Sequence, residues 1–169
     1  IDRLTELRLS THLMITDPVR YLEPLRDAGA DGVSAHIEAV PDPEPFFDRA
    51  HGLGLDAGLV VNPATPIESV LPFLDRCSMV VVMSVQPGFG GQSFIPAILD
   101  KVRVLRESID SSGLATDIQV DGGIDTATVG PAHDAGADIV VAGTSVFRTR
   151  DPGAAVDDLY ASMNDHGAP

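Results

Sequence analysis

Short apolar runs rich in β-branched residues recur along the chain, and each is followed by a longer stretch with helical periodicity. The runs are almost continuously apolar, which is typical of parallel strands covered on both faces. The lengths between them suit right-handed βαβ crossovers. The pattern therefore predicts six strands, at residues 9–15, 33–37, 56–61, 79–84, 118–121 and 139–142.

The predicted helices begin and end at recognisable residues. Three of them start with a capping side chain before a proline at the first helical position, which predicts helices at 19–28, 67–74 and 153–163. The motif Ala-Gly-Ala-Asp occurs twice, at residues 28–31 and 135–138. At each place a helix is expected to end at the glycine and a strand to begin after the aspartate. No linker, charge block or low-complexity segment interrupts the βα repeat, so residues 1–169 are interpreted as a single domain. The three capping pairs are Asp17-Pro18, Thr65-Pro66 and Asp151-Pro152.

Alternating βα units suit either a flavodoxin-like open sheet or a closed barrel. Polar residues and glycine lie at the carboxyl ends of the predicted strands, which converge on one mouth in a barrel but spread along an edge in an open sheet. We therefore expect an α/β fold, a (β/α)8 TIM barrel of which this chain carries about six units. Residues 1–7 are expected to be the tail of a helix after an unseen strand, so the domain is N-terminally incomplete. The residues that favour the barrel are His12, His36, Asn62, Ser84, Asp121 and Gly143.

The chain is strongly acidic, with 25 acidic against 11 basic residues and a formal net charge of -14. Nucleic acid and anionic membrane surfaces are therefore not expected as partners, and an anionic ligand has to be held by backbone N–H groups. The single Cys77 excludes an internal disulfide framework and a Cys-rich zinc site. No apolar run has the length of a membrane span, and we expect a cytoplasmic protein.

Three predicted strands end in glycine-rich segments. The first reads Met-Ser-Val-Gln-Pro-Gly-Phe-Gly-Gly-Gln at residues 83–92, and the others are Val-Asp-Gly-Gly-Ile at 120–124 and Val-Ala-Gly-Thr-Ser at 141–145. Backbone without side chains can approach a phosphate closely and offer it several N–H groups. A flexible loop and ordinary tight turns are the alternatives. Convergence of all three at one mouth favours a phosphate site, as is common after the last two strands of such barrels.

Asp121 and His12 are the candidate reactive residues. Asp121 ends a predicted strand inside the mouth, so a proton-transfer or metal-binding role is favoured over a solvated turn. A lone histidine on a strand is more often structural, and only the neighbouring mouth residues favour a functional His12. His51, His133 and His166 lie in predicted helices or the tail, where a solvated position is expected.

Six short motifs occur in an order that resembles the ribulose-phosphate 3-epimerase family: His12-Leu13-Met14, His36-Ile37-Glu38, residues 62–66, residues 83–92, residues 120–124 and Ala142-Gly143-Thr144. The resemblance implies a metal-dependent proton transfer at C3 of D-ribulose 5-phosphate, giving D-xylulose 5-phosphate, with two aspartates on opposite faces of the substrate. It further implies one divalent ion (Zn, Fe, Mn or Co), a sugar-phosphate substrate and a homo-oligomer.

The resemblance also implies roles for particular residues. Asp121 matches a proton carrier that is also a metal ligand, and His12 matches a metal ligand that touches substrate. Met14 and Met83 match methionines around the reacting centre. The matches to substrate and phosphate loops are Gly88, Phe89, Gly90, Gly91, Gly122, Gly123, Gly143 and Thr144.

Two features depart from the family pattern. Family members carry two earlier strands that supply a substrate serine, a metal-ligand histidine and the second aspartate, and nothing in this sequence matches them. Ser10-Thr11 stands where the family usually has aspartate and an apolar residue. The alternatives are therefore a hexulose (D-allulose) 6-phosphate 3-epimerase, or a catalytically inactive phosphate-binding barrel or fragment. We expect the 169-residue form by itself to lack epimerase activity, because it keeps one of two proton carriers.

Overall fold

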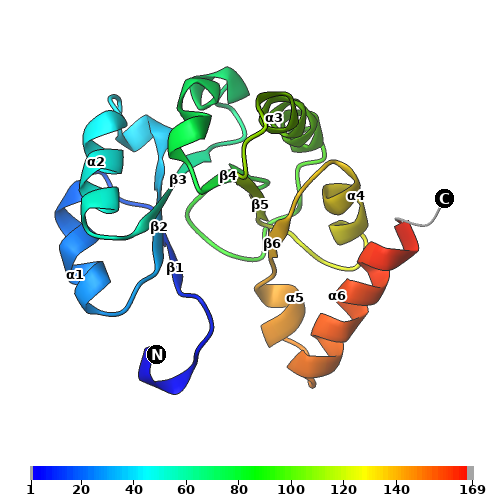
Figure 1. Cartoon of the computed structure of the whole chain (residues 1–169). Coiled ribbons are helices and arrows are strands. Elements are labelled where there is room, and N and C mark those ends of the chain that lie inside the picture. The colour runs from blue at the N-terminus through cyan, green and yellow to red at the C-terminus, as the bar shows by residue number, and fades with distance from the viewer. Residues whose placement is uncertain (1, 167–169) are drawn as a thin grey trace.

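The computed structural model describes residues 2–166, which form a curved, six-stranded parallel sheet (Figure 1). The strands lie in chain order, and each pairs only with its neighbours in sequence, as in a (β/α) barrel opened between its first and last strands. This arrangement confirms the six predicted strands and their parallel order. The strands are β1 Ser10–Leu13, β2 Gly32–His36, β3 Asp56–Val61, β4 Met79–Met83, β5 Asp117–Asp121 and β6 Ile139–Val141.

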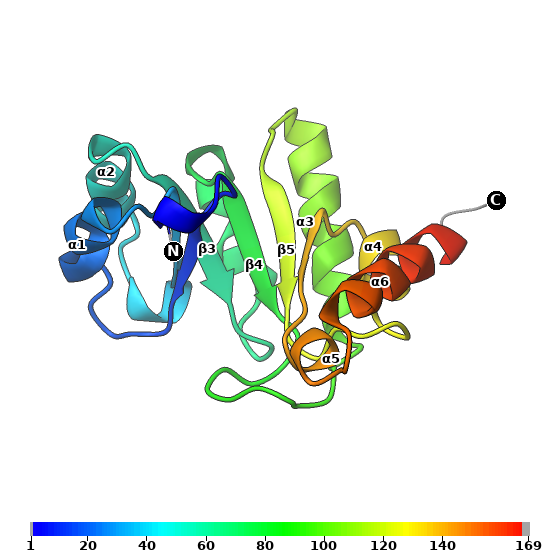
Figure 2. The same cartoon turned by 90° about the horizontal axis from the view of Figure 1, so that it is seen from below.

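Helices cover the convex face of the sheet, while the strand ends and the long loop after β4 lie together at one end (Figures 1 and 2). The α-helices are α1 Leu22–Asp27, α2 Glu44–Gly52, α3 Ile98–Ser112, α4 Val129–Asp134, α5 Thr144–Phe147 and α6 Pro152–His166. Short 3-10 helices are η1 Asp2–Leu4, η2 Val19–Tyr21, η3 Ile37–Ala39, η4 Ile67–Ser69 and η5 Leu71–Arg76.

The core has two layers because successive strand residues point to opposite faces. On β3, Leu59 and Val61 belong to the large cluster between the sheet and its helices, which also includes Phe46 and Phe47 of α2. Val60 points the other way and packs with Val81, Met83 and Val85 on the concave face. Burial on both faces explains why the strands read as continuous apolar runs.

Several expected helix boundaries are wrong. The segment expected as a helix at 67–74 is two 3-10 helices, since Pro72 lies near the start of η5 and lacks an N–H donor. The helix expected at 19–28 is divided into η2 and α1. Residues 5–7 are not helical, so the expected helix tail is reduced to η1, and Ile1 lies outside the described residues.

Only one of the three predicted caps is confirmed. Asp151 accepts a hydrogen bond from the Ala154 N–H at 3.1 Å, at the start of α6. No side-chain cap bond forms at the starts of η2 or η4, so the caps expected from Asp17 and Thr65 are wrong. The Thr65 hydroxyl donates to Glu38 instead.

The repeated Ala-Gly-Ala-Asp phrase builds the same structure twice. Gly29 and Gly136 have φ of +91° and +110°, a conformation that favours glycine. The aspartate that follows each glycine makes two hydrogen bonds to the preceding strand. Asp31 donates its N–H to the Leu9 carbonyl and accepts the Leu9 N–H on its side chain, and Asp138 does the same with Ile118. The sequence repeat is therefore a repeated helix-to-strand connection.

Within residues 2–166, every helix is too short or too polar to cross a lipid bilayer.

Candidate active site

His12 and Asp121 meet across the concave face of the sheet. His12 comes from β1 and Asp121 from the end of β5, which are not neighbouring strands. The Nδ1 atom of His12 lies 3.3 Å from Oδ2 of Asp121, and the side chains are 15% and 21% exposed. The strand-end positions of these two residues therefore converge as the sequence predicted.

His12 also contacts a second histidine. Its Nε2 lies 2.9 Å from Nε2 of His36, and the rings stack with centroids 4.9 Å apart. On its other side, His36 Nδ1 lies 3.5 Å from Oε2 of Glu38. Four polar side chains thus form a continuous row from Asp121 through His12 and His36 to Glu38.

The environment favours the ionised form of Glu38 and the neutral form of His36, since it lowers the pKa of both groups. Burial alone would raise the pKa of Glu38, but hydrogen bonds from Thr65 and the Asn62 N–H outweigh it and hold that pKa below its ordinary value. Burial, followed by the proximity of His12, lowers the pKa of His36. The row consequently ends in a carboxylate that accepts hydrogen bonds.

A lysine of α3 supports this end of the row. Lys101 Nζ donates to the carbonyl oxygens of Asn62, Pro63 and Thr65 in the loop after β3. Burial lowers the pKa of Lys101. The loop that presents Thr65 to Glu38 is therefore anchored to a helix, a role for Lys101 that sequence reasoning missed.

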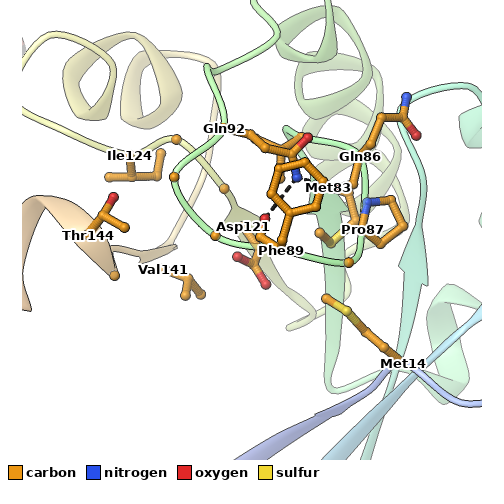
Figure 3. Close-up of a pocket in the computed structure, with 17 residues that line it drawn as sticks. Met14, Met83, Gln86, Pro87, Phe89, Gln92, Asp121, Ile124, Val141 and Thr144 are labelled. Atoms are coloured by element: carbon orange, nitrogen blue, oxygen red, sulfur yellow. Dashed lines mark hydrogen bonds between the residues drawn. The ribbon is translucent and has the colours of Figure 1, made fainter.

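A cavity of about 330 Å³ adjoins Asp121 (Figure 3). Its walls combine the three glycine-rich segments with Met14 and Met83, so it brings together every predicted substrate residue except His12. No Lys or Arg occurs among the described residues that line it. The lining residues are Met14, Met83, residues 85–92, residues 121–124, Val141, Gly143 and Thr144.

The loop after β4 is fixed by its own side chains. Gln92 Nε2 donates to the carbonyl oxygens of Gln86 and Phe89 at 2.6 and 2.8 Å. Figure 3 shows the loop lying across the cavity between Met14 and Thr144. At the base of the loop, the buried Ser84 hydroxyl donates to the Gly122 carbonyl, which joins the ends of β4 and β5.

The glycines around the cavity fall into two groups. A Cβ atom at Gly90 or Gly143 would meet nothing within 4 Å, so the space above them is open. Gly122 and Gly123 have positive φ, and a Cβ there would lie 2.4 Å from a methyl of Val85 or 2.6 Å from the Phe94 nitrogen. The second pair is therefore required by packing, whether or not substrate approaches.

The remaining candidates lie away from the cavity. His51 of α2 and His133 of α4 are exposed, as expected, and the side chain of His166 lies outside the described residues. Burial raises the pKa of Cys77 to about 12, which keeps its thiol protonated at neutral pH. Among residues 2–166, no group of three or more His, Cys, Asp or Glu is arranged to hold a metal ion.

A family model described as the ribulose-phosphate 3 epimerase family matches residues 1–147. The chain belongs to this family. The ribulose-phosphate 3-epimerase of Schizosaccharomyces pombe is 43% identical over 90% of this chain and 65% of its own length. That of Mycobacterium tuberculosis is 42% identical over 92% of this chain and 68% of its own length. The chain thus spans about two thirds of the length of these curated epimerases.

Solved structures agree on the fold. Orotidine 5'-phosphate decarboxylase from Pyrococcus horikoshii matches with a TM-score of 0.70 and 16% identity, over 96% of this chain and 77% of that one. KGPDC from Streptococcus mutans matches with a TM-score of 0.73 and 13% identity, over 98% of this chain and 76% of that one. At such identities the likeness concerns the barrel architecture alone.

Proposed function

We propose that this member of the ribulose-phosphate 3-epimerase family interconverts D-ribulose 5-phosphate and D-xylulose 5-phosphate by proton transfer at C3. The observation that carries the proposal is the contact of 3.3 Å between His12 Nδ1 and Asp121 Oδ2, beside a cavity walled by glycine-rich loops. The names of relatives more than 40% identical to this chain support the same activity.

Asp121 is the proton carrier on one face of the substrate. Its carboxylate lies at the edge of the cavity, where it can take the C3 proton as a general base and return one as a general acid. The apolar side chains of Met83 and Val85 limit water on the inner side. Inversion at C3 by this route needs a second carrier on the opposite face.

One divalent ion (zinc, iron, manganese or cobalt) is part of the proposal. His12 Nδ1 and Asp121 Oδ2 would hold it, since an imidazole nitrogen and a carboxylate oxygen facing each other suit these metals. When bound, the ion polarises the substrate carbonyl as a Lewis acid. The described residues supply this pair of donors, so water, substrate or groups outside residues 2–166 complete the coordination.

Backbone N–H groups hold the phosphate. The proposed donors are those of Gly90, Gly91, Gly123, Gly143 and Thr144, because none of the described residues that line the cavity has a cationic side chain. A side-chain-free backbone lets the anion approach closely. The open space above Gly90 and Gly143 is consistent with this use.

The proposal also covers the setting of the enzyme. We infer a cytoplasmic homo-oligomer that acts on a small sugar phosphate, without nucleic-acid or membrane partners. The net charge of -14 supports the exclusion of polyanionic partners. Phe147 of α5 and Tyr160 of α6, which are 78% and 62% exposed, are suitable for a subunit contact.

Asp121→Asn in the native protein tests the proposal. The amide cannot act as a base, so incorporation of solvent deuterium at C3 of D-ribulose 5-phosphate should fall by at least about 100-fold. Binding of the substrate's phosphate should remain measurable by calorimetry. The matched control is Asp125→Asn, the same change at an exposed residue of the neighbouring loop. Near-wild-type deuterium incorporation by Asp121→Asn would exclude the proposed role.

A further inference from the structure

The segment between β4 and α3 begins as a loop whose two ends are joined. The Ser84 N–H donates to the Asp121 carbonyl, and the Ser84 carbonyl accepts the Ile95 N–H, both at 2.9 Å. Residues 85–94, called the β4 loop below, lie between these bonds, and most of them line the cavity beside Asp121. The base of the β4 loop is therefore fixed to the sheet.

Packing does little to hold the tip of the β4 loop. Phe89 is 73% exposed, and a Cβ atom added at Gly88 or Gly90 would meet nothing within 4 Å. Gly88 and Gly91 have φ of +137° and +80°, and glycine carries more conformational freedom than any other residue. An exposed tip of this composition loses much conformational entropy when it is ordered, so some other contact has to fix it.

One side chain supplies hydrogen bonds across the tip. The chain turns at Pro87 and Gly88. The Gln92 amide nitrogen donates to the carbonyls of Gln86 and Phe89, which flank this turn, at 2.6 and 2.8 Å (Figure 3). No backbone-to-backbone hydrogen bond of ordinary geometry joins two residues within 85–94, all of which the structure describes. Gln92 therefore ties the two sides of the turn together where the backbone does not.

The chemistry of the Gln92 amide suits holding the loop more than contacting an anion. Its nitrogen carries two hydrogens, and two carbonyls already accept from it. The remaining oxygen is an acceptor, which a phosphate would repel. By contrast, the N–H groups of Gly90 and Gly91 have no hydrogen-bond acceptor among the described residues, so they are available to a ligand.

We infer that Gln92 is a positioning residue, whose amide holds the β4 loop in the conformation that presents the Gly90 and Gly91 N–H groups to the substrate's phosphate. The inference rests on the proposed function in one respect, since those two groups are there among the phosphate donors. A loop that is ordered before binding avoids the entropy cost of ordering on binding, which raises affinity. Loss of Gln92 should therefore weaken phosphate binding more than proton transfer at Asp121.

Gln92→Met in the native protein removes both donors and keeps a side chain of similar length. The Kd for inorganic phosphate, measured by calorimetry, should rise about 10-fold. The KM for D-ribulose 5-phosphate should rise by a similar factor while kcat falls by less than about threefold. Amide hydrogen exchange at residues 88–91 should become about 10-fold faster. Glu107→Met, which places the same new side chain at an exposed residue of α3, should change none of these.

Equal phosphate Kd values in Gln92→Met and wild type would overturn the inference, as would a fall in kcat as large as the rise in KM. The wild type alone gives another test. In NMR spectra, the side-chain amide protons of Gln92 should exchange with water more slowly than those of the exposed Gln86. Equal exchange would overturn the inference without any variant, so a poorly folding variant cannot protect it. Failure of the epimerase proposal would instead appear as absent C3 exchange in the wild type, whatever its phosphate binding shows.

Discussion

Gly143 and Gly123 line the same cavity but differ in what a side chain at each position would meet. Gly143 has φ of -101°, which other residues can adopt, and a Cβ there meets nothing within 4 Å. Gly123 has φ of +63°, and a Cβ there would lie 2.6 Å from the backbone of Phe94. A substitution at Gly143 can therefore test ligand approach, whereas one at Gly123 tests folding.

We predict that Gly143→Val weakens binding of D-ribulose 5-phosphate by at least about 10-fold, because the isopropyl group fills the space above the backbone. The free energy of unfolding should change by less than about 1 kcal/mol. Calorimetric titration and urea denaturation measure the two quantities. Gly52→Val is the control. A Cβ at Gly52 also meets nothing within 4 Å, but Gly52 ends α2 and does not line the cavity. Unaltered binding would contradict the phosphate assignment.

Glu38 should make the protein sensitive to acid. Its folded-state pKa is below the ordinary value of 4.5, so the unfolded chain binds its proton more readily. The stabilisation is present above that value and is lost as the pH falls through the lowered folded-state pKa. We predict that Glu38→Gln, which lacks this ionisation, loses less stability than the wild type across that window. Urea denaturation at a series of pH values measures the difference, and parallel curves would refute the prediction.

At the scale of elements, the repeated helix-to-strand connection is what sets the strand register at two places. Asp138 Oδ2 accepts the Ile118 N–H at 2.8 Å, while its own N–H donates to the Ile118 carbonyl. Asp31 makes the equivalent pair of bonds with Leu9. Each aspartate thus starts one strand while fixing the start of the strand before it.

We predict that Asp138→Ala destabilises the fold by about 1–3 kcal/mol, because the Ile118 N–H loses a charged acceptor at the start of a buried strand. The variant also loses an ion pair with Arg106. Asp110→Ala is the matched control, since it removes a different ion pair with the same arginine and touches no strand. Exposed ion pairs contribute at most about 1 kcal/mol, so Asp110→Ala should cost less stability than Asp138→Ala. If the denaturant midpoint fell equally in both variants, the two hydrogen bonds between Asp138 and Ile118 would not have the stabilising role proposed here for them.

Elements with strong periodicity were predictable, and those governed by proline were not. The strand at 56–61 was predicted to the residue, because a short apolar run that is buried on both faces favours a parallel strand. The segment 67–74 has helical periodicity, but Pro72 limits it to 3-10 turns. Thr65 precedes Pro66, as a capping residue would, but its hydroxyl donates to the carboxylate of Glu38 instead of capping a helix.

The sequence could predict only those residues of the candidate site that lie at the ends of strands. His12 and Asp121 could be placed together because parallel strands end at one mouth. The partners behind them come from side-chain contacts across 24 residues or more, such as His12 to His36 and Thr65 to Glu38. The available signal for Glu38 was a carboxylate two residues after a strand-end histidine, and periodicity does not predict where its oxygens point.

At the scale of the whole molecule, the sheet ends in two free edges. β1 and β6 each pair on one side only among the described residues. Val141 on β6 and Phe147 just beyond it are exposed, as is Met14 beside β1. Unpaired strand edges flanked by apolar side chains favour association with further strands. Two additional βα units would close such a sheet into a barrel of eight.

The 169-residue polypeptide by itself should not turn over D-ribulose 5-phosphate. Asp121 is the carboxylate among the described residues lining the cavity of about 330 Å³, and inversion at C3 by two carriers needs another on the opposite face. We expect no C3 exchange above background in deuterated water. Turnover by the purified 169-residue chain would overturn this expectation. Glu38 would then be the residue to test, because it lines a neighbouring cavity of about 510 Å³ that shares Met14, Pro87 and Gly88 with the first.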